Sequence, residues 1–264
     1  MFKQMAAHMR RGSVLGAVAV VAGGIFAQPI TAQPGSRPVL TKASLVAPAD
    51  SETTSVTVAA KKYAGAKILV STRARMLYFV LGRDTLLSAP VAIGVGKDFQ
   101  YKDKKYHFAT PRGRRSVLKK EENPIWLVPD WHYYEKATLK GIEAVHIEPG
   151  TVYPLKDGTW IQLRGDQVGR VNLFGNFWPF TPGIEIIFED KLFIPPMNTA
   201  QRRVPDALGP AKLDTGDGYL IHGTHEYTEN TIGQAASHGC VRMRNDDLLR
   251  LYRMVEPGTP VFIY

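Results

Sequence analysis

Short apolar or alternating runs separated by turn residues dominate the chain from residue 67 onward. Residues 68–70, 76–81 and 86–93 are rich in aliphatic and aromatic side chains, and a Gly-Arg-Asp turn lies at residues 82–84. Runs of this length and spacing are typical of antiparallel hairpins. Further runs of the same kind occupy residues 117–118, 184–188, 219–221 and 261–264. The pattern predicts a mainly β domain.

One helix is predicted near the carboxyl end. Apolar side chains recur at helical spacing over residues 248–255, and a Pro-Gly pair at residues 257–258 ends the pattern. Asn245 precedes this stretch, and asparagine is a preferred N-cap residue. We therefore expect a mainly β fold with few short helices.

The amino-terminal residues carry a targeting pattern. Three basic residues precede an apolar, small-residue run at residues 14–26. This run is short for a membrane-spanning helix, which needs about 20 residues, and it suits the apolar region of a secretory signal. We expect residues 1–32 to be a signal peptide and the protein to be exported to the periplasm or cell envelope. An uncleaved signal anchor is the alternative.

Residues 33–62 are rich in Pro, Ser, Thr and Ala, and no aromatic residue occurs among them before Tyr63. Such a stretch buries too little apolar surface to offset the entropy lost on ordering it. The sequence therefore predicts a flexible linker at residues 33–62 and one folded domain at residues 63–264.

The chain is basic throughout. Its formal net charge is +9, and removal of residues 1–32, which hold three basic and no acidic residues, leaves +6. A positive balance favours acidic partners. For an exported protein, an anionic cell-wall polymer or a membrane surface is a better candidate than nucleic acid.

Cys240 is the only cysteine in the 264 residues, so it cannot form an internal disulfide. In an oxidising compartment an unpaired thiol is a liability unless it is used. A buried structural thiol, a metal ligand and a nucleophile are the three interpretations.

Two short blocks near the carboxyl end carry the candidate chemistry. Residues 221–225 read Ile-His-Gly-Thr-His, and residues 237–242 read Ser-His-Gly-Cys-Val-Arg. A cysteine nucleophile needs a nearby imidazole to take its proton. His222 comes from a separate strand and can approach the sulfur across the site. It is therefore a better candidate than His238 for a base that also reprotonates a leaving amine.

The other residues of the two blocks suit acyl transfer. Gly223 and Gly239 let the backbone approach a substrate closely. The amides of Gly239 and Cys240 could face a developing oxyanion. Arg242 offers a cationic fork for a carboxylate.

Together the two blocks resemble the signature of the L,D-transpeptidases, the YkuD domain family. That family carries a His-Gly element followed by a Ser/Thr-x-Gly-Cys-hydrophobic-Arg element, and here eighteen positions separate His222 from Cys240. Asn-Pro-Ile-Trp at residues 123–126 and Gly-Thr-Pro-Val at 258–261 also fit the family. The resemblance covers residues 67–264. It implies an L,D-transpeptidase-like β-sandwich or barrel core with few short helices and an inserted segment.

The resemblance implies a role for each matching residue. Cys240 is the nucleophile, His222 is the general base and acid, and the carbonyl of Gly223 orients the imidazole ring. The residues implied to line the substrate site are Thr224, Ser237, His238, Gly239 and Arg242. No metal or organic cofactor is implied.

The implied partners are peptidoglycan stem peptides, as donor and as acceptor. Cys240 attacks the carbonyl of the L-centre of diaminopimelate in a tetrapeptide stem and expels D-Ala. The side-chain amine of a second stem then captures the acyl-thioester and forms a 3→3 cross-link. With water as acceptor the same site is an L,D-carboxypeptidase, and with a lysine of an envelope protein it is an anchoring enzyme.

Residues 136–198 form a longer segment than the compact family core needs at this place. Long segments near a site are often lids that recognise substrate. An extra β-ribbon that only packs on the core is the alternative interpretation.

A metal site is the alternative from a different class. The two blocks together offer four tetrahedral zinc ligands, namely His222, His225, His238 and Cys240. A site of this kind would make the chain a non-catalytic zinc-binding envelope protein.

Overall fold

The computed structural model describes residues 51–264. The predicted signal peptide, residues 1–32, and the part of the predicted linker before residue 51 lie outside the described residues. None of the helices within residues 51–264 is long and apolar enough to cross a membrane.

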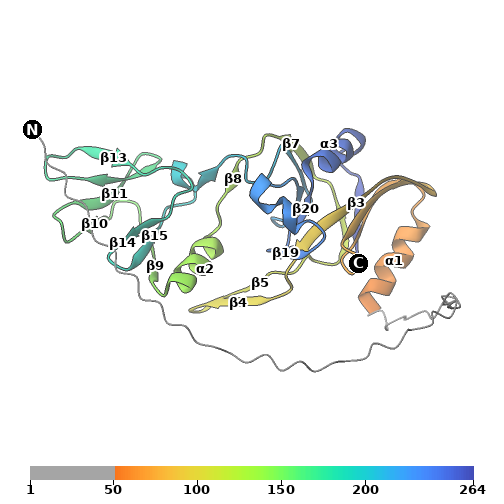
Figure 1. The fold of residues 1–264 in the computed structure, drawn as a ribbon, viewed down its shortest axis with the longest axis horizontal. Coiled ribbons are helices and arrows are strands. Elements are labelled where there is room, and N and C mark those ends of the chain that lie inside the picture. Colours follow the sequence, from red (N-terminus) through yellow and green to blue (C-terminus); the bar gives the residue numbers. More distant parts are fainter. Residues whose placement is uncertain (1–50) are drawn as a thin grey trace, which may run out of the picture. The chain divides into compact units, whose positions relative to one another are not determined.

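The largest sheet within the described residues has ten strands (Figure 1). Its strands, in sheet order, are β6 (Gly113–Ser116), β21 (Pro260–Ile263), β1 (Ala66–Ser71), β2 (Met76–Leu81), β3 (Asp84–Gly94), β20 (Val241–Met243), β18 (Leu220–His222), β17 (Ala211–Asp214) and β7 (Lys119–Glu122), with β19 (Ala235–Ser237) paired to β3. The predicted hairpins β1–β2 and β2–β3 are antiparallel. The pairs β1–β21, β18–β20 and β19–β3 are parallel. The prediction of a mainly β fold with few short helices is confirmed.

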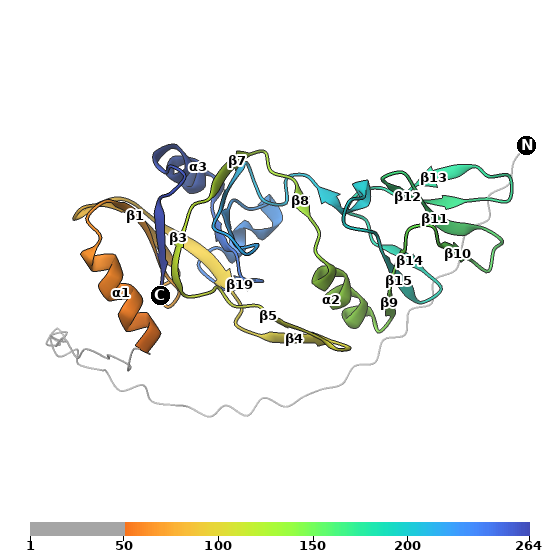
Figure 2. The ribbon, with the colours of Figure 1, turned by 180° about the vertical axis from the view of Figure 1, so that it is seen from behind.

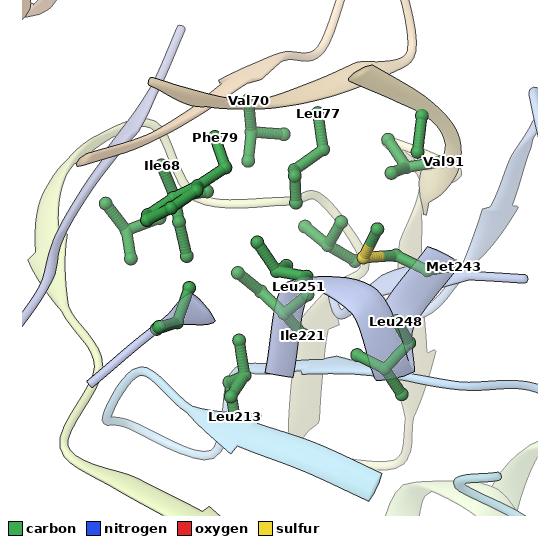
Figure 3. Close-up of a cluster of buried hydrophobic side chains, with 14 of the residues drawn as sticks. Ile68, Val70, Leu77, Phe79, Val91, Leu213, Ile221, Met243, Leu248 and Leu251 are labelled. Atoms are coloured by element: carbon green, nitrogen blue, oxygen red, sulfur yellow. The ribbon is translucent and has the colours of Figure 1, made fainter. Parts of the chain in front are cut away.

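The sheet curls around one hydrophobic core. Ile68 on β1 and Leu213 on β17 are separated by five strand-to-strand steps, which would be about 24 Å in a flat sheet at roughly 4.8 Å per step. Both nevertheless belong to one buried cluster. Leu248 and Leu251 of α3 (Asn245–Met254) point into the same cluster (Figure 3). Burial of such side chains, worth about 1.5–3 kcal/mol each, stabilises the curled sheet.

Residues 51–62 differ from the prediction. They form the helix α1 (Ser51–Lys62) and not a linker. Val56 and Ala60, four residues apart on one helix face, are buried together with Phe262 of β21. The linker was predicted because this stretch lacks aromatic residues that could pack on a core. In the structure, a narrow stripe of small apolar side chains is enough to pack the helix against β21. The linker prediction is wrong for this part of the chain.

The segment between β7 and β17, residues 123–210, adds no strand to the large sheet. We call it the inserted segment; it contains the predicted insertion, residues 136–198. Its elements are β8 (Trp126–Leu127) with β16 (Arg203–Val204), β14 (Ile186–Phe188) with β15 (Lys191–Ile194) and β9 (Glu143–His146), β10 (Val152–Pro154) with β11 (Trp160–Arg164), β12 (Gln167–Val171) and β13 (Phe177–Pro179), the helix α2 (Asp130–Lys140) and the 3₁₀ turn η1 (Ala200–Arg202). Two buried clusters lie largely within it. The inserted segment is therefore a folded β module and not a simple loop.

The helix α2 has no counterpart among the elements expected from the sequence. The helix follows Pro129 and ends at Gly141, whose left-handed backbone lets its amide close the last turn. Tyr133, Tyr134 and Ala137 form its buried side. Figures 1 and 2 show α2 beside β9 and beside the separate hairpin of β4 (Asp98–Tyr101) and β5 (Lys104–His107).

Shortening a buried side chain of α3 should lower the stability of the fold strongly. Leu251 is fully buried, whereas Leu139 on α2 is 77% exposed. We expect Leu251→Ala to lower the free energy of unfolding by about 2–5 kcal/mol because it leaves a cavity. Leu139→Ala, the matched control, should change it by less than about 0.5 kcal/mol. Denaturant titration of both variants measures this, and similar losses in the two would contradict the assignment.

Candidate active site

The parallel strands β18 and β20 bring the two sequence blocks together. Ile221 pairs with Val241, and His222 pairs with Arg242. Side chains alternate along a strand, and Ile221 and Val241 are buried in the core. His222 and Arg242 therefore share the opposite face. Cys240 lies directly before β20, two residues from Arg242, and follows the same alternation.

His222 is buried and uncharged at neutral pH. Burial, and secondly the positive charge of Arg242, lower the pKa of the imidazole to about 4, while the backbone carbonyls of Gly223 and Leu208 oppose this shift. Nδ1 is buried and has no hydrogen-bond partner of good geometry among residues 51–264. The Gly223 carbonyl thus influences the ring but does not hold Nδ1 in a well-formed hydrogen bond, and its predicted orienting role stays a prediction.

Cys240 carries a free, half-buried thiol. Its Sγ donates to the carbonyl of Gly218 at 3.9 Å. Burial raises the pKa of the thiol, while the backbone N–H of Leu220 and the charge of Arg242 lower it. In the resting state the thiol of Cys240 is therefore protonated and the imidazole of His222 is neutral. The thiol proton has to move when the sulfur attacks.

Ser237 shapes the turn that presents Cys240. Its buried hydroxyl donates to the carbonyl of Cys240 at 2.6 Å and accepts from the amide of Gly239 at 3.2 Å. The Ser237 hydroxyl, which was predicted to contact substrate, therefore makes its hydrogen bonds within the turn. The Gly239 amide already donates to the Ser237 hydroxyl within the turn. Of the two predicted oxyanion donors, the Cys240 amide therefore remains the candidate.

Gly239 is enclosed by the surrounding chain. Its φ is +130°, and an added Cβ would lie 2.8 Å from the Tyr219 ring and 3.2 Å from the carbonyl of Ala109. Its own carbonyl accepts from Oγ1 of Thr110 at 2.9 Å, and that hydroxyl accepts from the amide of Gly94 at 2.8 Å. Gly239 therefore lets the turn pack closely against β3. Its predicted place beside the substrate stays a prediction.

Arg242 supplies a cation that pairs with no carboxylate of residues 51–264. Its Nη2 donates to the carbonyl of Ala236 at 2.7 Å and to Oγ1 of Thr231 at 3.1 Å. Burial lowers the pKa of the guanidinium, and Cys240 is the one titratable group that opposes this shift. Within the described residues this positive charge thus acts on His222 and Cys240 and has no carboxylate partner, so it is suited to a substrate carboxylate.

Asn245 fixes the loop that follows His222. Its Oδ1 accepts from the amide of Thr224 at 2.9 Å, and its Nδ2 donates to the carbonyl of Thr224 at 3.0 Å. An added Cβ on Gly223 would lie 2.4 Å from Oδ1 of Asn245. Gly223 is therefore needed so that this clamp can approach the backbone.

One prediction about these residues is wrong. Asn245 does not cap α3, because Arg244 holds the N-cap position and makes no side-chain cap. Thr224 is buried and its hydroxyl bonds to that of Thr228 at 2.6 Å, and its predicted place beside the substrate stays a prediction. A short polar side chain before a helix caps that helix only if no other backbone group takes its hydrogen bonds.

His238 is held against the inserted segment. Its ring stacks on Trp131 at 4.3 Å between centroids and meets Phe108 edge-on at 4.5 Å. Its Nε2 lies 3.1 Å from the Glu135 carboxylate. The residue is exposed overall, so the predicted role beside substrate is open to it.

The four candidate zinc ligands do not form one group. His225 precedes η2 (Glu226–Thr231), where its Nδ1 accepts from the amide of Tyr227 at 3.4 Å and its ring stacks on Tyr227. His238 is instead held against α2. Among residues 51–264 no three His, Cys, Asp or Glu side chains are arranged to hold a metal. The geometry thus gives the zinc alternative no support.

Sequence reasoning missed Glu135, Trp131 and Thr110. Each contacts the cysteine block from a distant part of the chain, and no local motif marks any of them. The arrangement as a whole combines a thiol, an uncharged buried imidazole and an unpaired guanidinium. Such a combination suits acyl transfer to sulfur from a substrate that carries a carboxylate.

One family model and several known proteins are similar to this chain. The model of the YkuD family, the L,D-transpeptidase catalytic domain, matches residues 65–263. The probable L,D-transpeptidase YcfS of Escherichia coli is 46% identical over 135 residues, which cover 43% of this chain and 37% of that protein. The putative L,D-transpeptidase YqjB of Bacillus subtilis is 42% identical over 53 residues, which cover 20% of this chain and 29% of that protein. The matches thus span well under half the length of these relatives.

A solved structure is similar at lower identity. The L,D-transpeptidase from Xylanimonas cellulosilytica (residues 123–326) has 15% sequence identity and a TM-score of 0.40, over 81% of this chain and 69% of that chain.

Burial of His222 predicts a pH-dependent stability. The pKa falls from the usual 6.5 to about 4 on folding, so the unfolded chain binds this proton more readily as the pH drops. The contribution of His222 is complete above pH 6.5 and is lost as the pH falls towards 4. At pH 5 the loss is about 2 kcal/mol.

Denaturant titrations near pH 7.5 and pH 5 test this for the wild type and His222→Gln. The difference in unfolding free energy between the two pH values should be about 2 kcal/mol smaller in the variant. An equal difference in both proteins would show that the imidazole is not buried uncharged.

Proposed function

The chain belongs to the L,D-transpeptidase catalytic domain family, and on this premise we propose that it is a cysteine transpeptidase acting on peptidoglycan stem peptides. The observation that carries the proposal is the parallel pairing of β18 and β20. This pairing sets His222 beside Arg242, with Cys240 directly before β20. A base, a cation and a nucleophile thus converge from two separate stretches of chain.

In the first half-reaction the thiol of Cys240 attacks the carbonyl of the L-centre of diaminopimelate in a donor tetrapeptide. His222 is neutral at physiological pH, so it can accept the thiol proton as the C–S bond forms. The amide of Cys240 supports the oxyanion. Collapse of the intermediate breaks the C–N bond, and His222 returns the proton to the leaving amine of D-Ala.

In the second half-reaction an amine captures the acyl-thioester. The amine nitrogen forms the new C–N bond, the C–S bond breaks, and the sulfur leaves with a proton passed on by His222. With the side-chain amine of a second diaminopimelate residue as acceptor, the product is a 3→3 cross-link.

Arg242 binds a carboxylate of the donor stem in this proposal. Its Nη1 has no hydrogen-bond acceptor among residues 51–264, while Nη2 is held by Ala236 and Thr231. The guanidinium is thus anchored at one nitrogen and available at another. It also lowers the pKa of the Cys240 thiol, so donor binding and thiol activation are linked through one charge.

We also propose that the protein acts outside the cytoplasm. The basic residues and apolar run within residues 1–32 have the pattern of a secretory signal. Peptidoglycan stems are cross-linked in the cell envelope, so the proposed substrate and the proposed location agree. Fractionation of cells that express the full chain tests this proposal, and recovery of the protein in the cytoplasm alone would contradict it.

Replacement of the nucleophile tests the reaction. Cys240→Ala should lower D-Ala release from a diaminopimelate tetrapeptide by at least about a thousandfold, because no other thiol can form the acyl-enzyme. Incubation with a carbapenem should give a mass adduct on the wild type and none on the variant. Adduct formation or D-Ala release that survives in Cys240→Ala would exclude the proposed nucleophile.

Replacement of Arg242 tests the donor carboxylate. Arg242→Ala should raise KM for the tetrapeptide donor about tenfold, the usual effect of removing one charge-assisted contact. Arg242→Lys keeps the charge and should lie between the wild type and the alanine variant. Steady-state kinetics of D-Ala release measures both, and an unchanged KM in Arg242→Ala would refute the carboxylate contact.

A further inference from the structure

The inserted segment reaches the cysteine block through α2. Trp131 and Glu135 are four residues apart and therefore lie on one face of the helix. The Trp131 ring stacks on the His238 imidazole at 4.3 Å, with an interplanar angle of 22°. The Glu135 carboxylate lies 3.1 Å from Nε2 of the same imidazole. One face of α2 thus covers His238.

The position of α2 is fixed by a buried arginine. Arg202, only 1% exposed, donates from Nη2 to Oδ1 of Asp130, the first residue of α2, at 2.6 Å. Its other nitrogens donate to the carbonyls of Val128 and Pro195, each at 2.6 Å. Its guanidinium also lies over the Tyr133 ring at 4.8 Å. The helix is thereby held rigidly where it meets the site.

The charge of Glu135 is not neutralised by a lysine or arginine of the described residues. Its carboxylate contacts Nε2 of His238, which can donate to it as a neutral imidazole. Lys136, the next residue on α2, is instead paired with Glu185 at 3.7 Å. His132 lies three residues before Glu135 on this helix, and burial lowers its pKa and disfavours its charged form. An anionic group beside an aromatic face is the arrangement that recognises an ammonium ion.

The imidazole of His238 is oriented by this contact. Its Nε2 faces the Glu135 carboxylate, and its Nδ1 has no hydrogen-bond partner within the part of the chain that the structure describes. His238 is two residues before Cys240, so their Cα atoms are at most about 7.6 Å apart. The imidazole–carboxylate pair therefore lies at the edge of the reacting centre.

We propose that Glu135, Trp131 and His238 form the subsite for the acceptor ammonium group, which rests on the transpeptidase function proposed above. The anionic Glu135 draws the ammonium to the site, and His238 takes one proton from it. The free amine then forms the C–N bond to the acyl-thioester. The C–S bond breaks, and His222 carries the second amine proton to the departing sulfur. The inserted segment thus makes an amine the preferred acceptor over water.

The test compares acceptors that differ in charge. The acyl-enzyme is formed from a diaminopimelate tetrapeptide and is offered a diaminopimelate tripeptide stem, whose side chain is an ammonium, or methoxyamine, which is uncharged at neutral pH. Glu135→Gln keeps the shape and a hydrogen-bond acceptor but removes the charge. Glu185→Gln is the matched control, because Glu185 pairs with Lys136 and Lys140 of the same helix and not with His238.

We expect Glu135→Gln to lower the rate of amide formation with subsaturating tripeptide about tenfold. Its reaction with methoxyamine and its initial burst of D-Ala release should stay within about twofold of wild type. Glu185→Gln should match the wild type in all three measurements. The products are separated and counted by mass spectrometry.

Three results would overturn the subsite. Tripeptide capture could be unchanged in Glu135→Gln, both acceptors could be slowed equally, or the burst of D-Ala could be lost in this variant alone. The last two would indicate a structural or donor-side role of Glu135. Failure of the wild type itself to release D-Ala would overturn the proposed function, and the subsite with it.

Discussion

The register between β18 and β20 is the constraint on which the site depends. Ile221 faces Val241 inside the core, so His222 and Arg242 are brought side by side on the other face. A slip by one residue would turn His222 into the apolar cluster and Ile221 out of it. Exposing either aliphatic side chain costs about 1.5–3 kcal/mol. The hydrophobic core of the curled sheet therefore sets the geometry of the chemistry.

The same burial sets the protonation states. The imidazole of His222 loses its charge because it is enclosed, and the thiol of Cys240 keeps its proton for the same reason. Arg242 acts on both groups, since its charge opposes protonation of the imidazole and favours the thiolate. In the resting site Cys240 and His222 are thus both neutral, although the Arg242 guanidinium beside them has no carboxylate partner among residues 51–264. A thiolate and a charged imidazole form only when a substrate is bound.

The inserted segment is linked to this site through contacts that are individually modest. Arg202 ties α2 to the chain on either side of it, and α2 places Trp131 and Glu135 against His238. The segment has its own buried clusters, so it can present α2 as a rigid surface. A rigid module beside a catalytic turn can determine which acceptor is used without changing the nucleophile.

The sequence alone determined the mainly β class, the hairpins that open the large sheet and the two blocks that contain His222 and Cys240. These depend on local patterns, namely alternation along strands and short blocks of adjacent residues. Only the tertiary structure decided that residues 51–62 are a helix, that Asn245 clamps a loop, and that Glu135 meets His238, 103 residues away. A polar or small apolar side chain has several competing partners. The folded chain selects among them because it alone fixes which distant backbone and which charge come within reach.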